Sequence, residues 1–243
     1  MSIVPSIRTD EKSISHAITQ FISVYGIVDL LARCGGTKAK GFSAAELFTY
    51  ILTNVFRSGS FYMQQKLGRV PAAFAKNTYY RFLMNPRTNW LRFTTMLSER
   101  IINQHLRRLS SENRDDCFVI DDSLYERIGF RRTELASSVF DHVSHRFKKG
   151  FRLLTLGWTD GCSFLPINYS LLASANKENI LGPCGKIDRR TNAGKRRVMA
   201  RQKATVVMIE LLKMALASGH RAKYVLFDSW FSNPHQIVEI KDL

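Results

Sequence analysis

Two short apolar runs in this sequence each end in a carboxylate followed by a serine. They read VIDDS at 119–123 and VLFDS at 225–229. If the runs form neighbouring parallel strands, their acids emerge at the carboxyl edge of a sheet, where open α/β sheets bind ligands. Carboxylates held close together suit hard divalent cations such as Mg²⁺, and a pair of such ions can promote phosphodiester cleavage. The spacing therefore indicates a metal-dependent site for phosphodiester chemistry.

Only one of the two adjacent aspartates in the first motif can face such a site. Successive side chains of a regular strand point to opposite faces of the sheet, so Asp121 and Asp122 diverge. The second motif supplies one acid, Asp228. The alternative interpretation is that these acids form turns or cap helices, since Asp before Ser is common where loops begin.

A basic segment at 186–203 is the second feature that could do chemistry. It carries eight basic residues against one acid, Asp188. A loop is predicted by residues within it and just before it: Gly182, Pro183, Gly185, Asn192 and Gly194. The basic residues are Lys186, Arg189, Arg190, Lys195, Arg196, Arg197, Arg201 and Lys203. Such a segment beside carboxylates is suited to neutralising the phosphates of a DNA duplex; a flexible solvated loop is the alternative. A second basic cluster comprises Arg127, Arg131, Arg132, Arg146, Lys148 and Lys149 and extends the expected groove.

The composition agrees with a polyanionic partner. Among 243 residues, 36 Lys and Arg face 20 Asp and Glu, which gives a formal net charge of +16. This balance argues against a small cationic ligand and favours nucleic acid or an acidic surface. The 45% hydrophobic content excludes a wholly disordered chain. No secretory signal, clean apolar span or paired-cysteine zinc framework is recognisable, so a reduced cytoplasmic protein without a membrane partner is expected.

Helical periodicity dominates the first half of the chain. Apolar spacing predicts helices over 13–32, 43–56, 62–67 and 90–109, and a further one that starts at Asn77 or Thr78. Ser43 and Glu46 form a capping-box pattern.

The pattern changes near residue 116. Strands are predicted over 117–122, 151–159 and 163–170, with an Asp160-Gly161 turn between the last two. A helix over 203–218 and an apolar strand over 224–227, expected to be buried on both faces, follow. Another helix starts at Pro234. This order predicts an α/β domain.

These motifs resemble the DDE transposases of bacterial insertion sequences, and the IS-four family most. The resemblance rests on VIDDS, the hairpin with its basic segment, VLFDSWFSNP and the helical stretch NTYYRFLMNPRTNWLRF at 77–93. It implies a ribonuclease H-like α/β catalytic domain at 115–243, preceded by an all-helical DNA-binding region at 1–114. It also implies strand cleavage and transfer on double-stranded DNA, at transposon ends and target, with Mg²⁺ or Mn²⁺.

The resemblance also implies roles for individual residues. Asp122, which precedes Ser123, matches the family's first catalytic and metal-binding acid best, and Asp121 is the alternative. Asp228 matches the second acid. The family's third acid lies within Tyr-x-x-Arg-x-x-x-Glu-x-x-x-Lys, a pattern that does not follow Asp228, and Glu239 does not correspond to it.

This departure predicts a truncated transposase that does not cleave DNA alone. The alternatives are a non-catalytic DNA-binding protein, which could inhibit a full-length transposase, and a ribonuclease H-like nuclease acting on RNA. Assembly as a homo-oligomer, or pairing with a full-length copy, is compatible with the resemblance.

Overall fold

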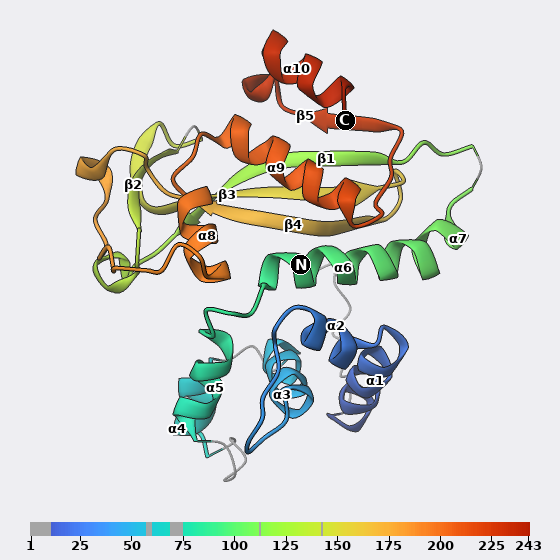
Figure 1. Ribbon diagram of the computed structural model, residues 1–243, viewed down its shortest axis with the longest axis vertical. Coiled ribbons are helices and arrows are strands. Elements are labelled where there is room, and N and C mark those ends of the chain that lie inside the picture. Colours follow the sequence, from blue (N-terminus) through green and yellow to red (C-terminus); the bar gives the residue numbers. More distant parts are fainter. Residues whose placement is uncertain (1–10, 57–59, 69–74, 112, 142) are drawn as a thin grey trace, which may run out of the picture. The chain divides into compact units, whose positions relative to one another are not determined.

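The computed structural model describes residues 11–56, 60–68, 75–111, 113–141 and 143–243. The chain divides into two compact units, Met1–Thr88 and Asn89–Leu243. Figure 1 shows helices throughout the described part of the first unit and a sheet with helices in the second. The expected mixed α/β class is confirmed.

The described part of the first unit contains five helices. They are α1 (Glu11–Val24), α2 (Ile27–Arg33), α3 (Ala44–Phe56), α4 (Phe61–Lys66) and α5 (Lys76–Leu83). The capping box is confirmed, because the Ser43 amide donates to Glu46 Oε2 at 2.7 Å and the Glu46 amide donates to Ser43 Oγ at 3.2 Å. Helix α5 begins slightly earlier than predicted, after Ala75.

The single helix predicted over 13–32 is interrupted in the structure. Gly26 has φ 56° and ψ 46°, a left-handed conformation that ends α1 and that glycine adopts readily. The axes of α1 and α2 are consequently inclined to each other by 54°. Within the described residues, no single helix is long and apolar enough to cross a membrane; this bent pair passes the same test only when its two helices are taken together.

The second unit opens with the helix predicted over 90–109. It consists of α6 (Trp90–Ile101), the π-helical turn η1 (Ile102–Leu106) and α7 (Arg107–Leu109). Leu91 and Ile102 belong to the core beneath the sheet, and α6 packs on β4 (Phe164–Leu172). The units therefore separate before α6, at 88/89, whereas the sequence places the domain boundary after it, at 114/115.

The described sheet of the second unit has five strands. Besides β4, they are β1 (Cys117–Glu126), β2 (Ser137–Asp141), β3 (Arg146–Thr159) and β5 (Tyr224–Phe227). The order is β2-β3-β1-β5, and β4 also pairs with β3. Strand β1 is antiparallel to β3 and parallel to β5. The long strand β3 thus pairs with β1 along one edge and with β2 and then β4 along the other.

The β3–β4 hairpin turns where the sequence predicts. Asp160 Oδ1 accepts hydrogen bonds from the amides of Cys162, at 3.0 Å, and Ser163, at 2.7 Å. Gly161 adopts φ 85°, which favours glycine at this position. These local bonds fix the turn.

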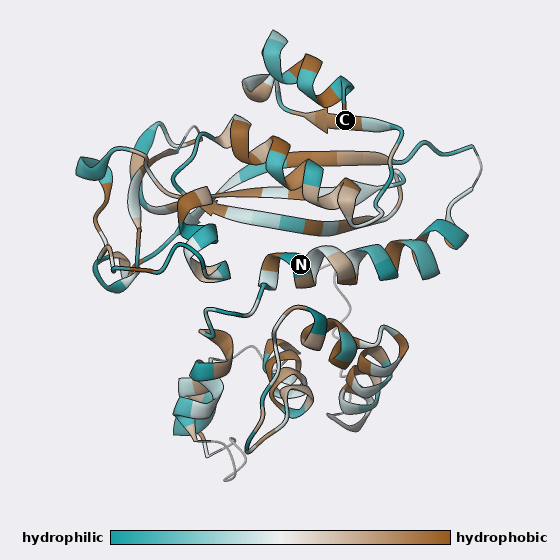
Figure 2. Ribbon diagram, viewed as in Figure 1, coloured by the Kyte–Doolittle hydropathy of each residue, from teal (hydrophilic) through white to brown (hydrophobic). Residues whose placement is uncertain are grey.

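Helix α9 (Ala204–Ala217) covers the hydrophobic face of the sheet. Its buried residues pack with alternate residues of β1 and β3, and Figure 2 shows hydrophobic residues along these elements. The contributors include Phe118, Ile120, Leu154, Leu156, Met208, Leu211 and Leu212. Helix α10 (Pro234–Lys241) contacts α9.

Strand β5 is buried on one face only, so the expectation of two buried faces is wrong for the described chain. Val225 and Phe227 pack against the core, whereas Tyr224 and Leu226 alternate to the other face and are 48% and 50% exposed. Four consecutive apolar residues cannot reveal this difference between faces.

Candidate active site and basic surface

The two acidic motifs lie on neighbouring parallel strands, as the sequence predicts. The β1–β5 ladder pairs Cys117 with Tyr224 and ends by pairing Ile120 with Phe227. Asp121 and Asp228 are the next residues on their respective strands. The two motifs therefore deliver their acids at the same edge of the sheet.

Strand alternation decides which aspartate of β1 shares a face with Asp228. Ile120 points into the core, so Asp122 lies on the core face and Asp121 on the opposite one. Phe227 also packs against the core, and Asp228 follows it in an extended backbone with φ −64° and ψ 149°. Asp121 and Asp228 are both exposed. The geometry thus brings together Asp121 and Asp228.

Asp122 has a different environment. Its Oδ2 accepts a hydrogen bond from Nε of Arg152 and forms an ion pair with Nη2, and the Asp122 and Arg152 side chains are only 14% and 24% exposed. Arg152 stands two residues from Leu154, the cross-strand partner of Asp122, so the ion pair crosses the ladder on the core face. Asp122 thus lies on the core face of β1, paired with Arg152, and Asp121 lies on the other face of the same strand.

Asp228 is presented by a firmly anchored turn. Its carbonyl accepts a hydrogen bond from the Phe231 amide at 2.9 Å, and Phe231 is buried in the core. Ser229 Oγ donates to Asp228 Oδ1 at 3.1 Å. Asn233 then caps α10 by accepting from the Gln236 amide at 3.1 Å. The sequence SWFSNP thereby fixes the position of the carboxylate.

Part of the basic segment is helical, which corrects the expectation of a loop. Helix α8 spans Asn192–Met199, and Thr191 Oγ1 caps it by accepting from the Gly194 amide at 3.0 Å. A Cβ added to Gly194 would lie 2.2 Å from the Asp188 carbonyl oxygen. This glycine permits close backbone packing rather than marking a loop.

Three of the eight basic residues form contacts within the protein. Arg197 pairs with Glu134 in bidentate geometry, with distances of 2.7 and 2.5 Å. Arg190 pairs with Asp188 at 3.1 Å, and Arg201 Nη2 donates to the Ala175 carbonyl at 2.8 Å. The other five are exposed, as is Arg190, but form no side-chain hydrogen bond or ion pair with the described residues: Lys186, Arg189, Lys195, Arg196 and Lys203.

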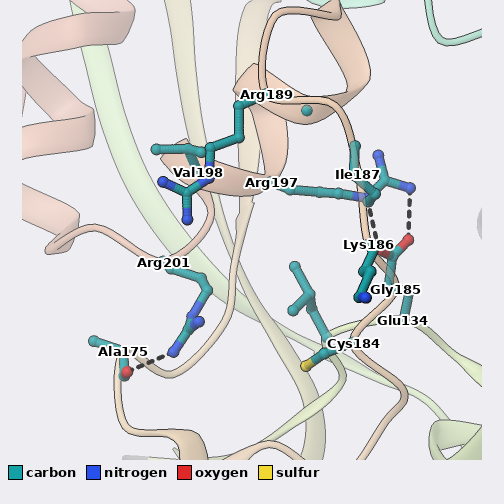
Figure 3. A pocket seen from close by; sticks show the side chains of 12 residues that line it. Glu134, Ala175, Cys184, Gly185, Lys186, Ile187, Arg189, Arg197, Val198 and Arg201 are labelled. Atoms are coloured by element: carbon teal, nitrogen blue, oxygen red, sulfur yellow. Dashed lines mark hydrogen bonds and ion pairs between the residues drawn. The ribbon is translucent and has the colours of Figure 1, made fainter.

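A pocket of about 610 Å³ lies within this basic surface. Figure 3 shows the Arg197–Glu134 pair and Arg201 on its walls, with Lys186 and Arg189 also lining it. One acid among these four cations leaves the pocket electropositive. A phosphate-containing ligand suits this charge.

Arg152 is the residue that motif reasoning missed. It occupies a core-facing position in the sequence FRLLTLGW, two residues before Leu154. A charged residue in phase with buried leucines needs a partner. The alternation that places Arg152 on the same face as the buried Leu154 therefore indicates an ion pair with the core-facing acid of β1.

Strand β1 continues to Glu126, past the predicted end at Asp122, but Asp121 and Asp228 both directly follow the last pair of the β1–β5 ladder. Two acids so placed and an electropositive pocket in the same unit suit an enzyme that acts on phosphodiesters. The family model of the DDE superfamily endonucleases matches residues 63–242, and the chain belongs to this family. DDE endonucleases act on DNA and generally use divalent metal ions. Comparisons with curated proteins and with solved structures gave no match.

Proposed function

We propose that the protein is a transposase-type DDE endonuclease of a bacterial insertion sequence, similar to the IS-four family. It would bind the duplex DNA of transposon ends and target in the cytoplasm. The observation that carries this proposal is the placement of Asp121 and Asp228 after the last paired residues of β1 and β5. A ribonuclease H-like core is supported by the central β1, with an antiparallel neighbour on one side and a parallel neighbour on the other.

We propose Asp121 and Asp228 as the metal-binding acids, in place of the Asp122 and Asp228 pair that the motif match favours. Their exposed carboxylate oxygens are the hard donors that Mg²⁺ or Mn²⁺ prefers. A bound divalent ion supplies activation of a water or hydroxyl and stabilisation of the leaving oxygen. Ser229 orients the Asp228 carboxylate through its hydrogen bond. Asp122 is a positioning residue that holds β1 against β3 through Arg152.

The DNA backbone would be bound by five exposed cations of the basic segment, Lys186, Arg189, Lys195, Arg196 and Lys203. Phosphate contacts of this kind fix the register of the duplex without reading its sequence. The helical unit before residue 89 is proposed to contribute further DNA binding.

DNA binding without cleavage is a second candidate function, and one observation favours it. Among the described residues, no group of three or more His, Cys, Asp or Glu side chains is placed to hold a metal ion. Two carboxylates suffice for one hydrated ion, whereas the resemblance implies three acids. DNA binding without cleavage is therefore the second candidate that the described residues support.

Cleavage separates these two proposals, and metal binding tests the assignment of the acids. The substrate is duplex DNA containing the sequence that flanks the gene, with Mg²⁺ or Mn²⁺ added. Both proposals expect DNA binding and one weak Mn²⁺ site by electron paramagnetic resonance that Asp121→Asn and Asp228→Asn each abolish. Asp122→Asn is the matched control and should retain Mn²⁺ binding. Metal-dependent nicking that Asp121→Asn abolishes would support the endonuclease, and DNA binding with no nicking would support the second candidate. Mn²⁺ binding lost only in Asp122→Asn would contradict the assignment of the acids.

A further inference from the structure

The β2–β3 hairpin extends the sheet beyond the strand that carries the acids. Strand β3 pairs with β1 only from Gly150 onward, whereas β2 pairs with Arg146–Gly150. The arms of this hairpin therefore have each other, and not β1, as partners. The proposed function assigns the hairpin no role.

An exposed aromatic pair lies across the two arms. Phe140 and Phe147 are cross-strand partners with ring centroids 5.3 Å apart and planes inclined by 69°. Phe147 is 70% exposed and Phe140 is 38% exposed. Aromatic rings so placed are available to bind a partner.

Basic residues lie near this pair. Arg146 precedes Phe147 and is exposed. Lys149 shares the strand face of Phe147, and its Nζ lies 4.6 Å from the centroid of the Phe130 ring. Arg131 contacts the same ring at 5.8 Å. Arg146 and Lys149 therefore flank Phe147 along β3, and Lys149 and Arg131 add positive charge at Phe130.

The nearby acids are already engaged within the protein. The Asp141 carboxylate accepts from the Val143 amide at 3.2 Å and from Ser144 Oγ at 2.5 Å. Glu126 pairs with Lys148 at 3.2 Å. Charge complementarity therefore favours a polyanion over a second copy of this basic chain.

The hairpin and the proposed metal-binding acid lie on one face of the sheet. Thr155 is the cross-strand partner of Asp121, so these two side chains lie on the same face of the sheet. Phe147 lies on that face too, because every second residue of β3 points to the same side. Eight residues separate Phe147 from Thr155. At about 3.3 Å per residue this spacing is about 26 Å. It corresponds to about eight base-pair steps of B-DNA at about 3.4 Å each.

We propose that the β2–β3 hairpin is a second DNA-binding element, which enters the major groove about eight base pairs from the phosphate at Asp121 and Asp228. Arg146 and Lys149 bind backbone phosphates. Phe147, supported by Phe140, contacts the base edges. The major groove admits a two-stranded β-ribbon, and apolar side chains contact thymine methyl groups there. This inference rests on the proposed function, because it takes DNA as the partner.

Binding of the full chain to labelled duplex DNA across a salt series tests the proposal. Phe147→Ala should weaken binding about fivefold or more with little change in salt slope. The double variant Arg146→Ala with Lys149→Ala should lower the slope by about 1.8, because each lost phosphate contact removes about 0.9. Matched controls are Phe164→Ala, which removes another exposed ring, and Lys177→Ala with Lys241→Ala, and both should bind as the wild type does.

Cross-linking locates the contact. 5-Iodouracil, which places iodine where thymine carries its methyl group, is introduced at successive positions of the duplex. We expect cross-links to the hairpin within a window about eight base pairs from the cation-binding position, and their loss in Phe147→Ala. Unchanged thermal unfolding would confirm that this variant folds.

Three results would overturn the proposal. If the wild type binds DNA and both hairpin variants bind with the same affinity and slope, the hairpin has no role and the proposed function survives. If Phe147→Ala alters the sedimentation mass but not DNA affinity, the aromatic pair joins two copies of the chain. If the wild type binds no DNA, this inference and the proposed function both fall.

Discussion

The guanidinium of Arg152 donates a hydrogen bond from Nε to Asp122 Oδ2 and forms an ion pair with the same oxygen through Nη2, across the β1–β3 ladder. This ion pair occupies the core face of the sheet, and strand alternation places the neighbouring Asp121 on the opposite face. Two adjacent aspartates thus have separate environments. One is largely enclosed and paired with a cation, and the other is exposed beside Asp228.

Breaking this ion pair should destabilise the second unit. Asp122→Asn leaves the largely enclosed Arg152 without its anion, and we expect a loss of about 1–3 kcal/mol in the free energy of unfolding. Urea denaturation measures it. Replacing both partners, Asp122→Leu with Arg152→Met, should recover much of the loss, because no unpaired charge remains. Asp121→Asn is the control and should stay within about 0.5 kcal/mol of the wild type.

Stability should fall on mild acidification because of His220. This buried imidazole lies with Nε2 2.9 Å from the Thr95 carbonyl and 3.2 Å from Ser98 Oγ. Burial lowers the pKa of His220, so the folded state resists protonation. The unfolded chain takes up the proton near its ordinary value of about 6.5, so stability present above that pH is lost as pH falls below it.

The variant His220→Gln isolates this effect. Its free energy of unfolding should be lower at pH 8, and the difference from the wild type should shrink as pH falls toward 5. The measurement is urea denaturation at each pH. A difference that stays constant over that range would show that the imidazole does not titrate with folding.

The packing role of Gly194 can be tested by adding one methyl group. Gly194→Ala would drive a Cβ against the Asp188 carbonyl, and we expect a loss of about 1–3 kcal/mol with displacement of α8. At Gly129 an added Cβ meets nothing within 4 Å, so Gly129→Ala is the control. Equal thermal midpoints for the two variants would refute the packing explanation.

Residues of the basic segment should have two different roles, DNA binding and stabilisation of the fold. Lys195→Ala should lower the salt slope of DNA binding by about 0.9 without affecting stability, because Lys195 is exposed. Arg197→Ala should instead cost about 1 kcal/mol of stability, since it removes the partner of Glu134 at a site where the two side chains are 34% and 31% exposed. Anisotropy titrations and urea denaturation of both variants distinguish these roles; identical behaviour would contradict the division.

Local signals account for what the sequence predicts well. The Ser43–Glu46 capping box, the Asp160 turn and the parallel delivery of two acids depend on residues close in the chain or on strand order. The choice between Asp121 and Asp122 cannot be predicted from such local signals, because it depends on which face of the sheet α9 covers. Helix α8 was obscured because Gly194 meets a packing requirement set by Asp188.

Strand β3 connects two parts of the protein that are proposed to bind DNA. It pairs with β1 beside Asp121 and, at its other end, carries the Phe147 arm of the hairpin, so its length sets the spacing between two proposed DNA contacts. Lengthening both hairpin arms by two residues would keep every side chain on its face and move the tip outward by about 6.6 Å. The contact on DNA would shift by about two base pairs. The number of residues in β3 would thus determine the distance along the DNA between the two contacts.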